Sequence, residues 1–193
     1  ESAFRGCTGL TSVEFNAENC TTKGSFYYPV FEGCTALSIV TIGENVKNIP
    51  AYAFYECTGL TSIEIPNSVT SIGHFAFNGC TNLTNVKIEE GVKSIGQEAF
   101  AGCSYLKSII IPNSVSSIGD GLFSDCNKSM QIINFSSVEL TGNHNVINAP
   151  NGYIEGEFVY ADINEVKTLC GCTVDKFSFD GLEYTINKGN FGT

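Results

Sequence analysis

Cysteine is the residue type with the most scope for chemistry in this sequence, which holds nine cysteines and two histidines in 193 residues. Five cysteines recur at one constant interval, and a sixth precedes them by a slightly longer one. Such a column could be a disulfide framework of a secreted protein or a row of buried thiols acting as small apolar residues. If the column stacks at the spacing of neighbouring strands, equivalent Cβ atoms lie about 4.8 Å apart, whereas a disulfide requires about 3.8 Å. We therefore predict a structural column of free, buried thiols, comprising Cys7, Cys34, Cys57, Cys80, Cys103 and Cys126.

Three cysteines lie outside this thiol column. A disulfide from Cys20 is conceivable but has no assignable partner. Cys170 and Cys172 flank a glycine and could form a redox pair or half of a metal site. Because no second cluster of cysteine or histidine accompanies them, we expect a plain loop or an edge strand instead. The sequence leaves the redox state of these three thiols open.

The remaining reactive residue types do not form a known site. The sequence contains no nucleophile elbow, zinc-protease motif, phosphate-binding loop or dinucleotide-binding glycine motif. His74 and His144 are expected on the surface, in a variable position and a polar loop. Asp162, Asn164 and Glu165 superficially suggest calcium, but the alternating acids and the glycine of a calcium loop are missing. We therefore predict no metal, no cofactor and no enzyme, because catalysis would need a site built from acids of the tail.

Charge and hydropathy restrict the classes of partner. The chain has 10 basic and 20 acidic residues, a formal net charge of −10 and an isoelectric point near 4.5. Nucleic-acid binding requires a basic face, so no nucleic-acid partner is expected. No apolar run approaches a membrane span of about 20 residues, so we expect no membrane insertion within this chain. The acidic surplus is interpreted as a solubilising surface, with a docking surface for a basic partner as the alternative.

Predicted strands recur at the same interval as the cysteines, and these strands would position the side chains of any site. Ile63 and Ile65 alternate with Ser62 and Glu64, which predicts a short strand with one buried face. Pro66 ends this strand because proline cannot donate to a ladder. A single unit is too small to fold alone, so each is expected to share a core with its neighbours in a stack. The clearest apolar columns are Phe31, Phe54, Phe77, Phe100 and Phe123, then Leu37, Leu60, Leu83 and Leu106, and finally Ile42, Ile65, Ile88 and Ile111.

Two departures from the period define the predicted domain organisation. Residues 1–135 are predicted to form six repeats, with an insertion at about residues 17–29. After the last column cysteine the apolar pattern slips by one residue, to Met130, Ile133 and Phe135. Beyond this point the pattern decays.

The tail, residues 136–193, is predicted to hold a degenerate repeat, an insertion and a C-terminal cap. Phe177–Phe191 is interpreted as the worn repeat, and Gly142–Cys172 as the insertion before it. Within that insertion, Glu157–Leu169 could form a β-hairpin around a polar turn. An independent small β-domain is the alternative. Because the chain begins and ends partway through a unit, we expect a fragment of a longer array whose signal and anchor lie elsewhere.

Three units carry the repeat most clearly: AFYECTGLTSIEIPNSVTSIG at 53–73, AFNGCTNLTNVKIEEGVKSIG at 76–96 and AFAGCSYLKSIIIPNSVSSIG at 99–119. Their columns resemble the BspA-like leucine-rich repeats, over about residues 1–135 and only weakly over 157–193. The resemblance implies a leucine-rich-repeat solenoid, a curved right-handed stack with a parallel sheet on the concave side and short strands or 3₁₀ turns on the convex side. It also implies secreted or cell-surface proteins of host-associated bacteria and some protozoa that adhere to host proteins or other cells.

Fold does not fix function, so the function implied by this resemblance is an expectation. We expect a non-catalytic, adhesin-like scaffold whose concave sheet binds a protein, such as a host extracellular-matrix or cell-surface protein, or a glycan. The candidate binding residues are the positions expected to face outward from the strands, namely Ile39, Thr41, Ser62, Glu64, Asn85, Lys87, Ser108, Ile110, Ile132 and Asn134. Most are small or polar, and the isoleucines could mark contact, although isolated exposed aliphatics are ordinary. The alternatives are binding through tyrosines of the insertions (Tyr27, Tyr28 and Tyr153) and a structural spacer without a ligand of its own.

Overall fold

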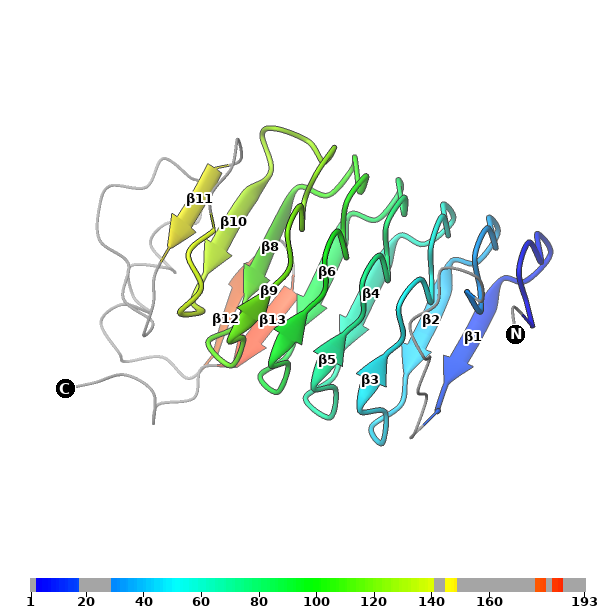
Figure 1. Ribbon diagram of the computed structural model, residues 1–193, viewed down its shortest axis with the longest axis horizontal. Coiled ribbons are helices and arrows are strands. Elements are labelled where there is room, and N and C mark those ends of the chain that lie inside the picture. The colour runs from blue at the N-terminus through cyan, green and yellow to red at the C-terminus, as the bar shows by residue number, and fades with distance from the viewer. Residues whose placement is uncertain (1–2, 18–28, 141–144, 149–175, 180–181, 186–193) are drawn as a thin grey trace.

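The protein forms a parallel β-solenoid in which equivalent residues of neighbouring coils are 23 residues apart, which confirms the predicted fold class (Figure 1). The computed structural model describes residues 3–17, 29–140, 145–148, 176–179 and 182–185. Among these residues there is no helix with the length and hydrophobicity to cross a membrane. The insertion expected at 17–29 falls almost entirely outside the described part of the chain, as do Cys20 and the tyrosines of both insertions.

One strand of each coil belongs to the concave sheet. The four-residue strands are β1 (Ser12–Phe15), β2 (Ile39–Ile42), β4 (Ser62–Ile65), β6 (Asn85–Ile88), β8 (Ser108–Ile111), β10 (Gln131–Asn134) and β11 (Asn145–Asn148). The hydrogen-bonded pairs of this sheet, β1–β2, β4–β6, β8–β10 and β10–β11, are all parallel. Strand β2 also lies in contact with β4, and β6 with β8. Alternation of buried and outward residues follows the pleat of each strand. The pattern along β2 and β4 is therefore exposed, buried, exposed, buried.

A second, shorter parallel sheet runs along the coils. Its two-residue strands are β3 (Asn48–Ile49), β5 (Ser71–Ile72), β7 (Ser94–Ile95) and β9 (Ser117–Ile118), in that spatial order. Turns on the convex side also join neighbouring coils through the backbone. In one such set, the N–H groups of Phe54 and Glu56 donate to the carbonyls of Ala76 and Asn78, at 2.8 Å each. Coils are thus held on three sides by hydrogen bonds between equivalent segments.

The core lies between the two sheets and the convex turns. Phe54, Phe77 and Phe100 are fully buried, and their rings stack on one another with centroids 5.3 Å apart. Offset stacking of aromatic rings adds to the stabilisation from burial. The leucine column and the isoleucines at the ends of the concave strands surround this row. Each coil therefore completes the core of its neighbour, as the repeat pattern predicted.

Two strands of the tail are described. Strands β12 (Lys176–Phe179) and β13 (Leu182–Thr185) pair antiparallel, whereas the strands of the coils pair in parallel. The two strands therefore form an antiparallel pair within the expected worn repeat Phe177–Phe191, whose remaining residues lie outside the described part of the chain, so that repeat stays a prediction. Only Asp180 and Gly181 separate the two strands, and an Asp-Gly pair favours tight hairpin turns. The hairpin expected at Glu157–Leu169 falls outside the described residues.

Candidate functional site

The outward positions of the concave sheet form two rows, here called the outer face. The parallel register aligns Ser62 with Asn85 and Glu64 with Lys87, and extends in both directions. One row consists of Ser12, Ile39, Ser62, Asn85, Ser108 and Gln131. The other row consists of Glu14, Thr41, Glu64, Lys87, Ile110 and Ile133. Eight of the ten candidate binding residues lie in these rows.

Ile132 and Asn134 were wrongly assigned to the outer face. The structure aligns Ile132 with Ile109 and Asn134 with Ile111, both of which face the core. The apolar pattern slips by one residue at Met130, but strand β10 keeps the register of the other coils, and a change of one residue exchanges the two faces of a strand. Ile132 is 1% exposed and Asn134 is fully buried. Both residues are therefore part of the interior.

A buried asparagine at the end of an apolar column needs polar partners. The side-chain oxygen of Asn134 accepts hydrogen bonds from the backbone N–H and the hydroxyl of Ser136, at 3.1 and 2.6 Å. Its amide nitrogen donates to the carbonyl of Val138 at 2.7 Å. Asn134 thus closes the turn that follows β10 from inside the core. No apolar signal in the sequence marks this position as buried.

Sequence reasoning missed four residues of the outer face. Ser12 and Glu14 are exposed on β1, where Val13 and Phe15 alternate with them. The alternation of outward and inward residues that marks the strands of the other units is present in this first unit as well. Gln131 and Ile133 replace the misassigned residues of β10.

The outer face consists of two halves that differ in accessibility. The open half lies on β1, β2, β4 and β6 and comprises Ser12, Glu14, Ile39, Thr41, Ser62, Glu64, Asn85 and Lys87. Ile39 is 61% exposed there, and its neighbours in the open half are exposed or half-buried. The covered half lies on β8 and β10 and comprises Ser108, Ile110 and Ile133, which are 8%, 3% and 3% exposed. Ser108 and Ile110 are therefore on the predicted face but inaccessible.

A charge cluster lies at the boundary of the open half. The Lys87 ammonium contacts the carboxylate of Glu64 at 3.0 Å and that of Glu89 at 2.6 Å. Partial burial lowers the pKa of Lys87, but its hydrogen bonds and charge attraction to Glu89 and Glu64 outweigh this, and the pKa is raised. Because two acids surround one base, the cluster remains acidic. An incoming cationic group would compete with Lys87 for Glu64, whose side chain is 65% exposed.

The thiol column lies on the other side of the core. Cys34, Cys57, Cys80, Cys103 and Cys126 are free and buried. Each thiol donates to the backbone carbonyl of a phenylalanine in the preceding coil, at distances from 2.9 to 3.4 Å. Burial raises the pKa of Cys57 to about 12 and that of Cys80 well above its ordinary value. The thiols of Cys57 and Cys80 are therefore neutral and poorly nucleophilic at physiological pH. At the end of the column the pKa of Cys126 is lowered instead, mainly because its thiol shares a hydrogen bond with Cys103.

Cys7 departs from the prediction for the thiol column because it is exposed. It lies in the first described coil, where it has no preceding coil among the described residues to cover it. Cys170 and Cys172 fall outside the described residues, as do His144 and the acids considered as calcium ligands. His74 is exposed, and its Nδ1 accepts a hydrogen bond from the backbone N–H of Gln97 at 2.9 Å.

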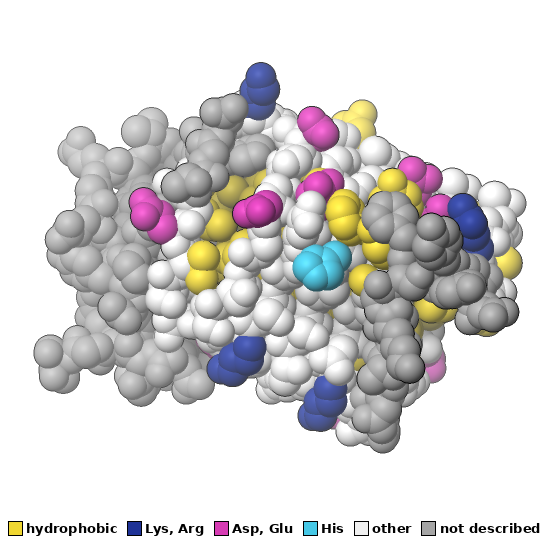
Figure 2. Space-filling model, in the orientation of Figure 1, with side chains coloured by type: hydrophobic (Ala, Val, Ile, Leu, Met, Phe, Trp, Pro, Cys, Tyr) yellow, Lys and Arg dark blue, Asp and Glu magenta, His cyan; other side chains and the backbone are white. Residues whose placement is uncertain are grey.

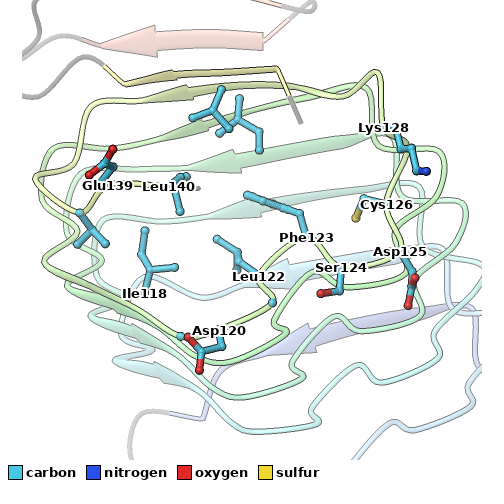
Figure 3. Close-up of a pocket in the computed structure, with 15 residues that line it drawn as sticks. Ile118, Asp120, Leu122, Phe123, Ser124, Asp125, Cys126, Lys128, Glu139 and Leu140 are labelled. Atoms are coloured by element: carbon cyan, nitrogen blue, oxygen red, sulfur yellow. The ribbon is translucent and has the colours of Figure 1, made fainter. Parts of the chain in front are cut away.

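A cavity of about 450 Å³ lies at the C-terminal end of the coils (Figure 3). Leu122 and Phe123 point into it from the last convex turn, and Leu140 enters from the segment after β10. Asp120, Asp125, Glu139 and Lys128 lie around its rim and point away from one another (Figure 3). The ring of Phe123 is the last described member of the phenylalanine stack. The cavity therefore continues the core at the end of the stack and does not gather polar groups for chemistry.

Charged side chains are dispersed over the face shown in Figure 2. Most acidic side chains of this face lie in its upper half, and the basic side chains lie singly at its top, right and lower edges. Over the described part of the chain, no three histidine, cysteine or acidic residues are placed to hold a metal ion.

The chain is similar to leucine-rich repeat proteins. The family model for the BspA type leucine rich repeat region matches residues 1–80 and 24–148, with six copies. A leucine-rich repeat protein from Bacteroides capillosus is 30% identical; the match covers 64% of this chain and 78% of that chain, with a TM-score of 0.43. A leucine rich cell surface protein from Faecalibacterium prausnitzii is 28% identical over 78% of this chain, also with a TM-score of 0.43. The match spans only 46% of that chain.

A Treponema pallidum leucine rich repeat protein is 24% identical, with 64% of this chain and 58% of that chain covered and a TM-score of 0.40. No curated protein matches the chain. The family model covers well over half of the sequence, and the regular register, the parallel concave sheet and the buried leucine column have the arrangement that the repeat requires. The chain therefore belongs to the family of BspA type leucine-rich repeat proteins.

Proposed function

We propose that this chain is a non-catalytic scaffold that binds a protein or a glycan through the open half of its concave sheet. The observation that carries the proposal is the exposure of Ile39, at 61%, within a row of polar residues on a regular sheet. A large exposed aliphatic residue among polar residues can serve as an anchor for a partner. The proposal also includes an extracellular or cell-surface location, which the family resemblance supports.

The chemistry of the open half favours a partner with polar and cationic groups. Glu14 and Glu64 are exposed acids, and Lys87 is already paired with two carboxylates. Small residues at Thr41 and Ser62 keep this part of the sheet flat. A flat polar surface suits a protein strand or an extended glycan better than a small molecule, which requires a concave pocket.

The test begins with a binding screen of the purified protein. The probes are immobilised fibronectin, laminin and collagen, together with a glycan array. The variant Ile39→Asp/Ser62→Arg/Glu64→Arg changes the open half. The control variant Tyr105→Asp/Ser104→Arg/Glu44→Arg makes the same changes in charge at exposed positions outside the concave strands.

We expect the open-half variant to lose at least about tenfold in affinity for a probe that binds the parent, because central contacts dominate binding energy. The control variant should bind like the parent. Equal affinity of the parent and the open-half variant would contradict the proposal. Failure of the parent to bind any probe would favour the structural spacer.

A further inference from the structure

The covered half of the outer face is apolar and buried, which the repeat itself does not explain. Ile110 and Ile133 occupy the same row as Thr41, which is exposed. All three residues lie on strands with neighbours in the sheet, so lateral packing does not distinguish them. Something must therefore lie over the outer face at β8 and β10.

The β12–β13 hairpin has the amino-acid composition of a segment that packs on an apolar surface. Its register pairs Phe177 with Tyr184 and Phe179 with Leu182. The intervening pairs are Lys176 with Thr185 and Ser178 with Glu183. Because cross-strand partners share a face and successive residues alternate, the four apolar residues occupy one face and the polar residues the other.

The position of the hairpin agrees with this role. In Figure 1 it lies at the β8–β10 end of the solenoid, and in Figure 3 the pale red strand of the hairpin runs outside the coils, alongside the strands of the concave sheet. Residues 149–175 connect it to β11, and a segment of that length can span about 3.3 Å per residue, far more than the width of the sheet. An isolated two-stranded hairpin is marginally stable in water, so it requires an apolar surface to pack against.

We infer that the β12–β13 hairpin packs its apolar face on Ile110 and Ile133 and closes the covered half of the concave sheet. The occupant of this apolar surface is thus a segment of the same chain. The hairpin also sets the C-terminal limit of the surface available to a partner. This last consequence rests on the proposed function, whereas the packing contact does not.

Hydrogen–deuterium exchange of the full chain tests the contact without any partner. In the parent, peptides covering residues 176–185 are expected to be protected. The variant Ile110→Asp/Ile133→Asp should lose this protection while peptides covering β4 and β6 keep theirs. The control Ile39→Asp introduces the same acid on the open half and should leave the hairpin protected. An unprotected hairpin in the parent, or unchanged hairpin protection in the double variant, would overturn the inference.

A second pair of variants changes the hairpin and leaves the coils intact, in case the first variant unfolds the end of the stack. Phe177→Ser/Phe179→Ser removes apolar residues from one face and should uncover Ile110 and Ile133, which increases binding of a hydrophobic fluorescent dye. Lys176→Ser/Glu183→Ser changes the polar face and should leave dye binding at the parent level. Dye binding that does not rise in the phenylalanine variant would contradict the inference. Both tests give their result whether or not the proposed function holds.

Discussion

The thiol of Cys80 donates to the backbone carbonyl of Phe54, 3.2 Å away and 26 residues earlier in the chain. Because one coil spans 23 residues, this bond joins one coil to the coil before it. The Phe54 carbonyl also accepts the backbone N–H of Cys57 in its own coil. Each buried cysteine of the column therefore packs as a small apolar residue and adds one weak hydrogen bond to the interface between two coils.

Replacement of a buried column cysteine should destabilise the stack. Cys80→Ala removes a fully buried sulfur and its hydrogen bond, and we expect the free energy of unfolding to fall by about 1–3 kcal/mol. The matched control is Cys7→Ala, which changes an exposed member of the same column and should alter stability by less than about 0.5 kcal/mol. Urea denaturation followed by circular dichroism measures both. Equal effects of the two substitutions would contradict the role assigned to the buried thiols.

Stability should decrease in mildly alkaline solution because the folded state holds buried thiols such as those of Cys57 and Cys80 neutral. The pKa of Cys57 is raised from 9.0 to about 12 by burial. A raised pKa in the folded state gives a contribution that is complete below pH 9 and is lost progressively above it, as the unfolded thiol ionises first. Between pH 8 and pH 10 this loss is about 1 kcal/mol for such a thiol.

The variant Cys57→Ala checks this dependence. Its urea midpoint should fall less between pH 8 and pH 10 than that of the parent, because one of the titrating thiols is absent. An identical decrease in the parent and the variant would assign the alkaline loss to other groups.

The concave strands were predictable from the sequence because apolar residues occupy every second position along each strand, and this pattern recurs at the constant interval of the coils. The error at β10 has a physical cause. Met130 occupies the leucine column one residue late, and a slip in an apolar column predicts a slip of the strand that does not occur here. Asn134, which aligns with Ile111, is satisfied by Ser136 and Val138, so a polar residue occupies a core position without an apolar signal.

The close approach of neighbouring coils at Gly96 leaves no room for a side chain. A Cβ atom at this position would collide with the backbone of Gly73 and His74 in the preceding coil. We expect Gly96→Ala to destabilise the protein by about 1–3 kcal/mol through displacement of that backbone. At Gly9 a Cβ atom would meet nothing within 4 Å, so Gly9→Ala should be close to neutral. Thermal unfolding of the two variants compares them, and similar melting temperatures would argue against tight packing at Gly96.

Equivalent convex turns use a left-handed backbone at the residue before the cysteine. Gly33 has a φ of 68°, and Glu56 has a φ of 54° at the corresponding position of the next coil. A non-glycine residue in this conformation costs about 1–2 kcal/mol. Gly33→Ala should therefore be destabilising, although its Cβ atom would have space. Glu56→Gly relieves the backbone strain, but glycine loses more conformational entropy on folding, so this variant should be neutral or stabilising by less than about 1 kcal/mol. Denaturant titration that showed the opposite signs would refute this explanation of the turn.

The accessibility of the outer face could not be predicted from the repeat. Ser62 and Ser108 have the same residue type in the same row, two coils apart, yet the first is exposed and the second is 8% exposed. The difference arises from segments distant in sequence, which a local pattern does not encode. The Asp180-Gly181 pair was a usable signal for the hairpin, but the spacing of the surrounding phenylalanines was interpreted as a repeat.

Maleimide labelling of Ser62→Cys and Ser108→Cys, read by peptide mass spectrometry in the native protein, tests most directly whether the concave sheet is open at one end and closed at the other. We predict rapid labelling at position 62 and labelling at position 108 that becomes rapid only after denaturation. Labelling at similar native rates at the two positions would contradict it.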